Sequence, residues 1–184
     1  MEGCWVSEVA VGIVLAAGEG RRYGSPKVLA EDGGWLDTAV SALLGGGCSS
    51  VLVVLGAADA PMPEGARAVH APDWASGLSA SLKAGLSAAG EAEFAVVHVV
   101  DTPDVGPEVV RAVLGAARSE PSRLARAVFA GEPGHPVVFG REHWADVVVA
   151  STGDSGARAF LAARSDVALV ECSHWATGVD RDFR

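Results

Sequence analysis

The feature that most constrains the fold is a set of short, almost entirely apolar runs separated by helix-like segments. The clearest runs span residues 9–15, 51–55 and 94–100. A strand that is apolar on both sides needs cover on both faces, which is typical of parallel sheets with helices on either side. Apolar residues recur at helical spacing between and after these runs, over residues 35–44, 77–89 and 107–117. Strands and helices are therefore expected to alternate.

The rest of the chain continues this alternation. Short strands are predicted at residues 68–70, 127–130, 137–139 and 167–170, and helices at 141–149 and 155–163. Because the 184 residues contain no internal repeat, low-complexity segment or linker, one domain is expected over 1–184. The predicted fold class is α/β, a single-domain, doubly wound, mostly parallel sheet of Rossmann-like type. In such sheets, ligands bind beyond the carboxyl ends of the strands.

The charge balance excludes one large class of partners. The chain carries 14 lysine and arginine residues against 23 aspartate and glutamate residues, a formal net charge of −9. Proteins that bind nucleic acid normally carry a basic face, so no nucleic-acid partner is expected. The sequence has neither a membrane-length apolar stretch nor a leader-like start, which predicts no membrane partner and a cytoplasmic location. Cys4, Cys48 and Cys172 lack metal-type spacing and are expected to be unpaired thiols.

A glycine-rich, basic loop at residues 15–27 directly follows the first apolar run. Glycine lets backbone N–H groups approach phosphate oxygens, and Arg22 and Lys27 add the positive charge that suits a polyphosphate. The glycines are spaced Gly-x-Gly-x-x-x-Gly, whereas dinucleotide sites use Gly-x-Gly-x-x-Gly, and the P-loop pattern is absent. The loop therefore favours a nucleoside triphosphate over a dinucleotide, with an ordinary tight turn as the alternative.

Five segments carry a resemblance to a known family. The most specific are Leu-Ala-Ala-Gly-x-Gly-x-Arg-x-Gly-x-Pro-Lys at 15–27 and Gly-Asp-x-Gly-Ala-Arg at 153–158. The others are Trp-x-x-Gly-Leu-x-x-Ser-Leu-Lys-x-Gly at 74–85, Asp-Thr-Pro at 101–103 and Gly-His-Pro at 134–136. In this order they resemble the MobA-like NTP transferases, and above all the molybdenum cofactor cytidylyltransferases. The resemblance runs over nearly the whole chain.

The resemblance implies a nucleotide site built on the loop. Arg22 and Lys27 would neutralise the triphosphate, and backbone groups would contact the base and phosphates at Leu15, Ala16, Ala17, Gly18 and Gly20. A helix start would add Gly77, Ser79 and Ser81, although capping or helix surface also explains these serines. Guanylyl-transferring relatives have glycine where this chain has Ala17, so CTP is favoured over GTP as co-substrate.

Two aspartates are the candidate magnesium ligands. Asp101 ends an apolar run, where an unpaired carboxylate is unfavourable, and Mg²⁺ commonly combines one or two carboxylates with phosphate oxygens. The alternative for Asp101 is a turn or helix cap. By resemblance the second ligand is Asp180, in a segment at 178–184 that is truncated or diverges from the family pattern; a solvated tail is the alternative. Arg22, Lys27 and Asp101 form the predicted catalytic set.

The resemblance also implies a site for a second substrate. His135 would border the pocket of a molybdopterin-type acceptor, and Arg158 would help to hold its anionic group, with Asp154 beside it. From the residues alone, His135 is a loop histidine. Asp154 and Arg158 lie four residues apart on a predicted helix and would pair with each other.

The reaction implied is transfer of NMP, CMP from CTP in the first instance, to the phosphate of a molybdopterin-type cofactor with release of pyrophosphate. Such a transfer needs alignment and charge neutralisation, and the motifs supply cations, backbone donors and a carboxylate. Three alternatives stay open. They are GTP or another phosphorylated acceptor, an NAD(P)H-dependent oxidoreductase of the nicotine-blue type, and a non-catalytic chaperone that carries the cofactor to a molybdoenzyme.

Overall fold

A seven-stranded sheet forms the centre of the computed structural model, which describes residues 8–182. Its strand order is β3-β2-β1-β4-β6-β5-β7. The three predicted apolar runs form neighbouring strands, β1 (Ala10–Leu15), β2 (Ser50–Leu55) and β4 (Phe94–Val99). The other strands are β3 (Ala66–His70), β5 (Leu124–Phe129), β6 (Glu132–Gly140) and β7 (Ala168–Glu171). Only β6 runs against its neighbours in this sheet, so the prediction of a mostly parallel sheet is confirmed.

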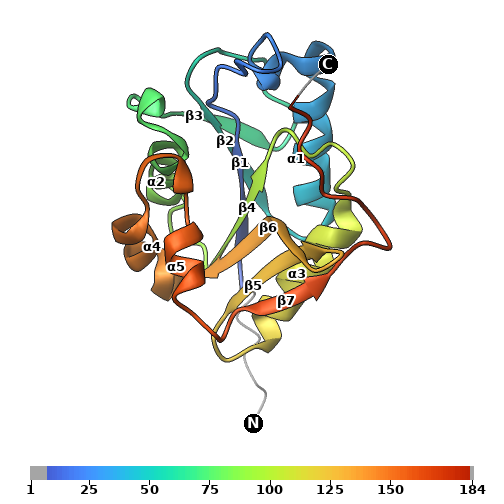
Figure 1. Ribbon diagram of the computed structural model, residues 1–184, viewed down its shortest axis with the longest axis vertical. Helices are drawn as coiled ribbons and strands as arrows, with labels where there is room; N and C mark the ends of the chain where they lie inside the picture. Colours follow the sequence, from blue (N-terminus) through green and yellow to red (C-terminus); the bar gives the residue numbers. More distant parts are fainter. Residues whose placement is uncertain (1–7, 183–184) are drawn as a thin grey trace.

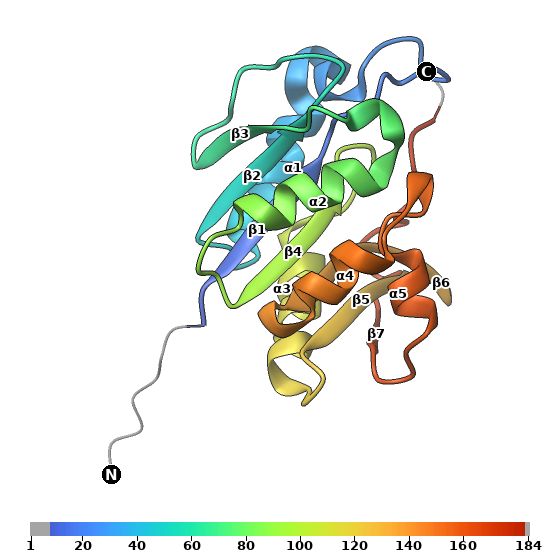
Figure 2. The ribbon, with the colours of Figure 1, turned by 90° about the vertical axis from the view of Figure 1, so that its left-hand side faces the viewer.

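Helices cover both faces of the sheet (Figures 1 and 2). One face carries α1 (Gly34–Gly45) and α3 (Pro107–Ser119), and the other carries α2 (Leu78–Ala88), α4 (Trp144–Ala150) and α5 (Arg158–Ala162). Alternate strand residues divide the core, because Val14 packs toward α1 and α3 whereas Ile13 packs toward α2. Short 3₁₀ turns complete the chain: η1 (Lys27–Gly33), η2 (Trp74–Ser76), η3 (Arg141–His143) and η4 (Gly153–Ser155). The doubly wound α/β fold is thus confirmed.

Strands β5 and β6 are longer than expected and pair as an antiparallel hairpin. A two-residue turn joins them, with positive φ at both Ala130 and Gly131, the backbone form that suits a tight hairpin. The sequence predicted a loop around Gly134-His135-Pro136, but these residues lie within β6. The interpretation of His135 as a loop histidine is therefore wrong.

Two predicted helices begin or break at glycines. Gly77 has φ 109°, so the helix predicted from residue 77 begins at Leu78. The helix predicted over 155–163 is interrupted by Gly156, with φ 52°, between η4 and α5. Asp154 and Arg158 consequently lie on different turns, and within residues 8–182 no ion pair joins them. The predicted pairing of these two side chains is wrong.

The cysteines follow the expectation where they are described. Cys48 and Cys172 are buried free thiols, and Cys4 lies outside the described residues. Burial raises the pKa of Cys48 to about 12. Across residues 8–182, none of the helices combines the length and apolar character that crossing a bilayer requires.

Candidate functional site

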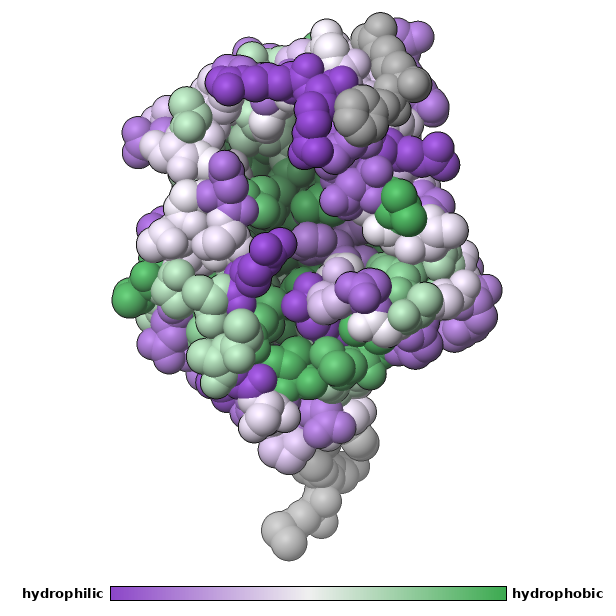
Figure 3. All heavy atoms as spheres, viewed as in Figure 1, coloured by the Kyte–Doolittle hydropathy of each residue, from purple (hydrophilic) through white to green (hydrophobic). Residues whose placement is uncertain are grey.

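Two cavities lie beyond the carboxyl ends of β1 and β4. The first, of about 700 Å³, is lined by the glycine-rich loop and the start of α2. The second, of about 860 Å³, is lined by β6, α5 and one residue of β5. Their walls meet at shared residues, Leu15, Leu78, Asp154, Arg158 and Asp180. Figure 3 shows the molecule hollowed across this face, with apolar surface inside the hollow and hydrophilic residues around it.

The glycine-rich loop offers unpaired backbone donors to the first cavity. The N–H of Gly24 donates to the carbonyl oxygen of Gly20 at 2.8 Å, which closes a tight turn. Gly20 has φ 63°, and a Cβ at this position would overlap the carbonyl oxygen of Ser25. Among residues 8–182, the N–H groups of residues 18–22 donate no hydrogen bond. Free N–H groups next to positive charge are the ordinary means of binding phosphate oxygens.

Lys27 is the centre of a charge cluster at the mouth of the first cavity. Its Nζ lies 2.7 Å from Oδ2 of Asp101 and 2.8 Å from Oδ1 of Asp182. The second oxygen of Asp182 lies 2.8 Å from Nη1 of Arg22. The C-terminal segment is held here by its backbone as well, since the N–H of Arg181 donates to the carbonyl oxygen of Asp101 at 2.8 Å. In Figure 1 this dark red segment returns beside the blue loop.

The protonation of this cluster follows from its contacts. Partial burial lowers the pKa of Lys27, but hydrogen bonds to Asp101 and Asp182 outweigh it and the pKa is raised. The hydrogen bond from Lys27 holds the pKa of Asp182 below its usual value. The pKa of Asp180 is raised by burial and then by the negative charges of Asp101 and Asp182. Among the described residues, Asp101 and Asp182 each form an ion pair with Lys27 whereas Asp180 forms none, so a cation would stabilise the negative charge of Asp180.

The structure brings nearly all the predicted nucleotide residues to one cavity. The first cavity is lined by Leu15, Ala16, Ala17, Gly18, Gly20, Arg22, Lys27, Gly77 and Ser81, together with Asp101 and Asp180. Ser79 is absent from this lining; its side chain is buried, and within the described chain its Oγ has no hydrogen-bond partner. Its predicted place in the nucleotide site is therefore not supported by the geometry.

The oxygen donors at the cavity mouth fit a magnesium ion. Asp101 and Asp180 both line the first cavity, and hard cations such as Mg²⁺ take carboxylate, phosphate and water oxygens. Within residues 8–182, no group of three or more His, Cys, Asp or Glu side chains has metal-binding geometry. The site therefore suits a cation that completes its ligand set with a bound triphosphate and water. It does not suit a metal held by protein ligands alone.

The predicted acceptor residues lie in or beside the second cavity. His135 and Arg158 line it, and Asp154 stands on the wall that both cavities share. Burial and the positive charge of Arg126 lower the pKa of His135 to about 4, so the imidazole is neutral at pH 7. Arg126, on β5, lines the same cavity and was missed from the sequence.

Two charged residues of the site were not predicted from the sequence. Asp182 was passed over in favour of Asp180, although the alternation Asp180-Arg181-Asp182 in an extended segment directs both carboxylates to one side. No local signal marked Arg126, which lies in a segment matching none of the five motifs. Its neighbours come from β6 and α5, and only the strand order brings them to it.

An extended glycine-rich loop with free N–H groups at the carboxyl end of an α/β sheet, beside a second cavity, suits enzymes that join a nucleotide to another small molecule. The chain belongs to the family of MobA-like NTP transferase domains, which residues 12–168 match, and it is a nucleotidyltransferase of that family.

The chain is also similar to individual known proteins. Nicotine blue oxidoreductase from Paenarthrobacter nicotinovorans is 35% identical over 188 residues, covering 93% of this chain and 91% of the relative. A homolog of the Mycobacterium tuberculosis protein Rv0371c, from Mycobacterium sp. strain JC1, has a solved structure with 28% identity, a TM-score of 0.75, and coverage of 95% and 90%. The fold is also that of 2-C-methyl-D-erythritol 4-phosphate cytidylyltransferase from Thermus thermophilus, with 23% identity, a TM-score of 0.71, and coverage of 95% and 92%.

Proposed function

We propose that this protein transfers CMP from CTP to the phosphate of a molybdopterin-type acceptor and releases pyrophosphate. The observation that carries the proposal is the meeting of two cavities beside Lys27 and Asp101. The first cavity has free N–H groups and cations for a triphosphate, and the second has the size and apolar floor of a ligand pocket. A bound donor and a bound acceptor would face each other across their shared wall.

The proposed step forms one bond and breaks one bond. An oxygen of the acceptor phosphate attacks the α-phosphorus of CTP, and the bond from that phosphorus to the β-phosphate oxygen breaks, so that pyrophosphate leaves. Lys27 neutralises charge on the phosphates, the loop N–H groups hold them, and the apolar floor orients the acceptor. Phosphoryl chemistry of this kind depends on alignment and charge stabilisation and needs no nucleophilic side chain.

Asp101 and Asp180 are proposed to hold Mg²⁺ together with the phosphates. The ion supplies charge neutralisation at the α-phosphate when it is bound. The role of the chain is to present the two carboxylates on one side of the first cavity. Both carboxylates line the first cavity, where a cation between them would offset their mutual repulsion.

Replacing Ala17 with glycine is expected to relax the choice of base. Ala17 is buried and lines the first cavity, and one methyl group in a pocket discriminates by about 1–3 kcal/mol. The ratio of kcat/KM for CTP over GTP should therefore fall by about tenfold or more. Because both donors are measured on the same variant, a general loss of activity cancels in the ratio. An unchanged ratio would show that Ala17 does not set the base preference.

A second candidate is an NAD(P)H-dependent oxidoreductase, which the name of the 35%-identical relative favours. The glycine spacing of the loop, which differs from the dinucleotide pattern, favours the transferase instead. Calorimetric titration with CTP, GTP, ATP, UTP and NADPH, each with Mg²⁺, separates the two. The transferase predicts the tightest binding for CTP. Tight NADPH binding without any nucleoside triphosphate binding would reject the transferase proposal. Tighter binding of GTP than of CTP would instead indicate guanylyl transfer.

A further inference from the structure

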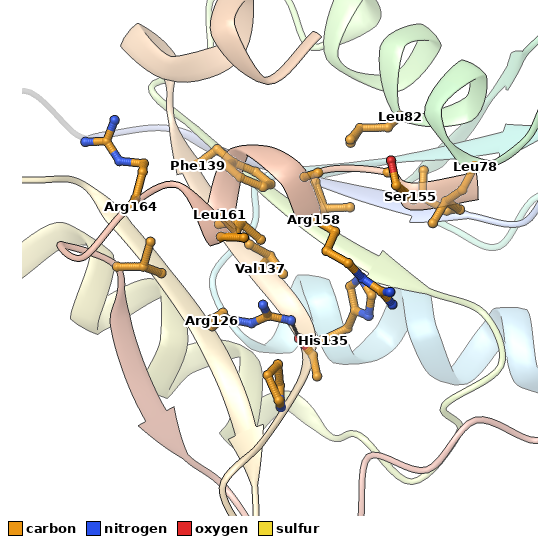
Figure 4. A pocket seen from close by; sticks show the side chains of 18 of the residues that line it. Leu78, Leu82, Arg126, His135, Val137, Phe139, Ser155, Arg158, Leu161 and Arg164 are labelled. Carbon is orange, nitrogen blue, oxygen red and sulfur yellow. Dashed lines mark hydrogen bonds between the residues drawn. The ribbon is translucent and has the colours of Figure 1, made fainter. Parts of the chain in front are cut away.

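The second cavity combines an apolar floor with two positive charges. Its floor is formed by Leu82, Val97, Val137, Phe139 and Leu161. Above it, Arg126 reaches in from β5 and Arg158 from the first turn of α5. In Figure 4 the two guanidinium groups extend toward His135, whereas Arg164 points away. The cavity therefore offers an apolar surface and a cationic end.

Arg126 is held in the cavity without a compensating charge. Its side chain is half-buried, and Nη2 makes a long hydrogen bond of 3.4 Å to the carbonyl oxygen of Gly134. Among the described residues, its buried Nε has no partner. Arg164 is different, because its guanidinium donates to both carboxylate oxygens of Asp166, at 2.9 and 2.6 Å. A buried donor without an acceptor is unfavourable unless a ligand supplies one.

The surroundings of Arg126 make its unpaired positive charge still less favourable. Burial, and then the positive charge of Arg158, lower its pKa. Three carboxylates also line the cavity, at Glu132, Asp154 and Asp180, yet within residues 8–182 none lies within 4.0 Å of either guanidinium. His135 is neutral at pH 7, so it can donate a hydrogen bond without adding charge. Two unpaired guanidiniums in one cavity are the usual arrangement for a multiply charged oxyanion.

We propose that Arg126, together with Arg158, binds the dianionic phosphate of an acceptor whose apolar part packs on the cavity floor. The apolar part lies on the floor at Val137, Phe139 and Leu161, and the phosphate lies between the guanidiniums. The assignment of this ligand as acceptor rests on the proposed function. The arginine site itself rests on the geometry of the second cavity.

The test compares three probes on four proteins. The probes are 1-naphthyl phosphate, 1-naphthol and inorganic phosphate, and the proteins are wild type, Arg126→Gln, Arg158→Gln and Arg164→Gln. Wild type is expected to bind 1-naphthyl phosphate at least about tenfold more tightly than either fragment. Arg126→Gln and Arg158→Gln should each weaken this binding by about 10- to 100-fold, the usual effect of losing a hydrogen bond to a charged group. Arg164→Gln should change it less than about twofold, because Asp166 already pairs that charge.

Equal binding of 1-naphthol and 1-naphthyl phosphate would overturn the proposal, since the cavity would then recognise only apolar surface. Equal losses in Arg126→Gln and Arg164→Gln would also overturn it, because they would indicate a general charge effect. Arg126→Lys checks folding and charge together: it should keep the wild-type unfolding midpoint and recover part of the affinity. Wild-type affinity for 1-naphthyl phosphate in a folded Arg126→Gln protein would reject the role of Arg126.

Titration of the same variants with Mg²⁺ and CTP separates this inference from the proposed function. CTP affinity in Arg126→Gln is expected to equal that of wild type, because Arg126 lies outside the first cavity. If wild type binds 1-naphthyl phosphate through Arg126 but no nucleotide, the proposed function fails and the arginine site stands. If CMP is transferred from CTP but the affinity for 1-naphthyl phosphate is the same in Arg126→Gln and wild type, the inference about Arg126 fails and the proposed function stands.

Discussion

Lys27→Ala is expected to lower kcat/KM for nucleotidyl transfer by about 10²- to 10³-fold, the usual effect of removing one preorganised charge-stabilising donor. Nζ of Lys27 lies 2.7 Å from Asp101 and 2.8 Å from Asp182. Without the ammonium group, these carboxylates face each other and the incoming triphosphate with only Arg22 nearby. Both the affinity for CTP and the rate of the chemical step should therefore fall. Pyrophosphate release, followed with CTP, Mg²⁺ and acceptor, measures the effect.

The matched control is Lys83→Ala, since the chain has only one other lysine. Lys83 lies on α2 and lines neither cavity, so this variant should keep wild-type activity. Circular dichroism on both variants separates loss of function from loss of fold. Full activity in a folded Lys27→Ala protein would remove Lys27 from the site.

Gly77→Ala is expected to lower both the stability of the fold and the activity. Gly77 has φ 109° and ψ −177°, a backbone form that is almost restricted to glycine. An added Cβ would lie 2.5 Å from Oδ1 of Asp154 and 2.6 Å from the backbone of Gly153. The strain should lower the free energy of unfolding by about 3 kcal/mol, which corresponds to a fall of about 6–12 °C in the unfolding midpoint.

The same substitution should also reduce activity, because Gly77 and Asp154 both line the first cavity and the contact joins the start of α2 to η4. Gly90→Ala is the control: Gly90 also has positive φ, at 64°, but open space surrounds it. That variant should lose about 1 kcal/mol from backbone strain alone and keep its activity. Thermal unfolding and the pyrophosphate assay measure both effects. Equal destabilisation by the two substitutions would contradict the close contact at Gly77.

The sequence predicted the parts of the fold that depend on local patterns. The apolar runs became β1, β2 and β4 because continuous apolar strands must be covered on both faces. The β5–β6 hairpin was missed because its turn is Ala130-Gly131, and the strongest hairpin signals are Asn-Gly and Asp-Gly. Strand direction depends on pairing across the sheet, so the reversed direction of β6 had no local signal either.

In the site, too, residues in local sequence motifs were predicted, whereas residues that act through distant partners were not. The loop residues and Asp101 were predicted because each follows a recognisable strand end. Asp182 and Arg126 were missed because their partners are far away in sequence: Asp182 contacts Lys27 across 155 positions. Ser81 lines the first cavity whereas Ser79, on the same helix, does not, and the sequence held no signal that distinguishes the two serines. Charge pairs between residues so far apart in the sequence can be identified only when the three-dimensional arrangement of the strands is known.

Incubation of the protein with CTP, Mg²⁺ and molybdopterin, followed by mass spectrometry of the products, tests the central claim most directly. The account predicts acceptor molecules heavier by one CMP unit, formed one for one with pyrophosphate and abolished by EDTA. Under the same conditions, the Lys27→Ala protein should form the product about 10²- to 10³-fold more slowly than wild type. Unchanged CTP and acceptor, in a wild-type protein that is folded and binds both, would contradict nucleotidyl transfer.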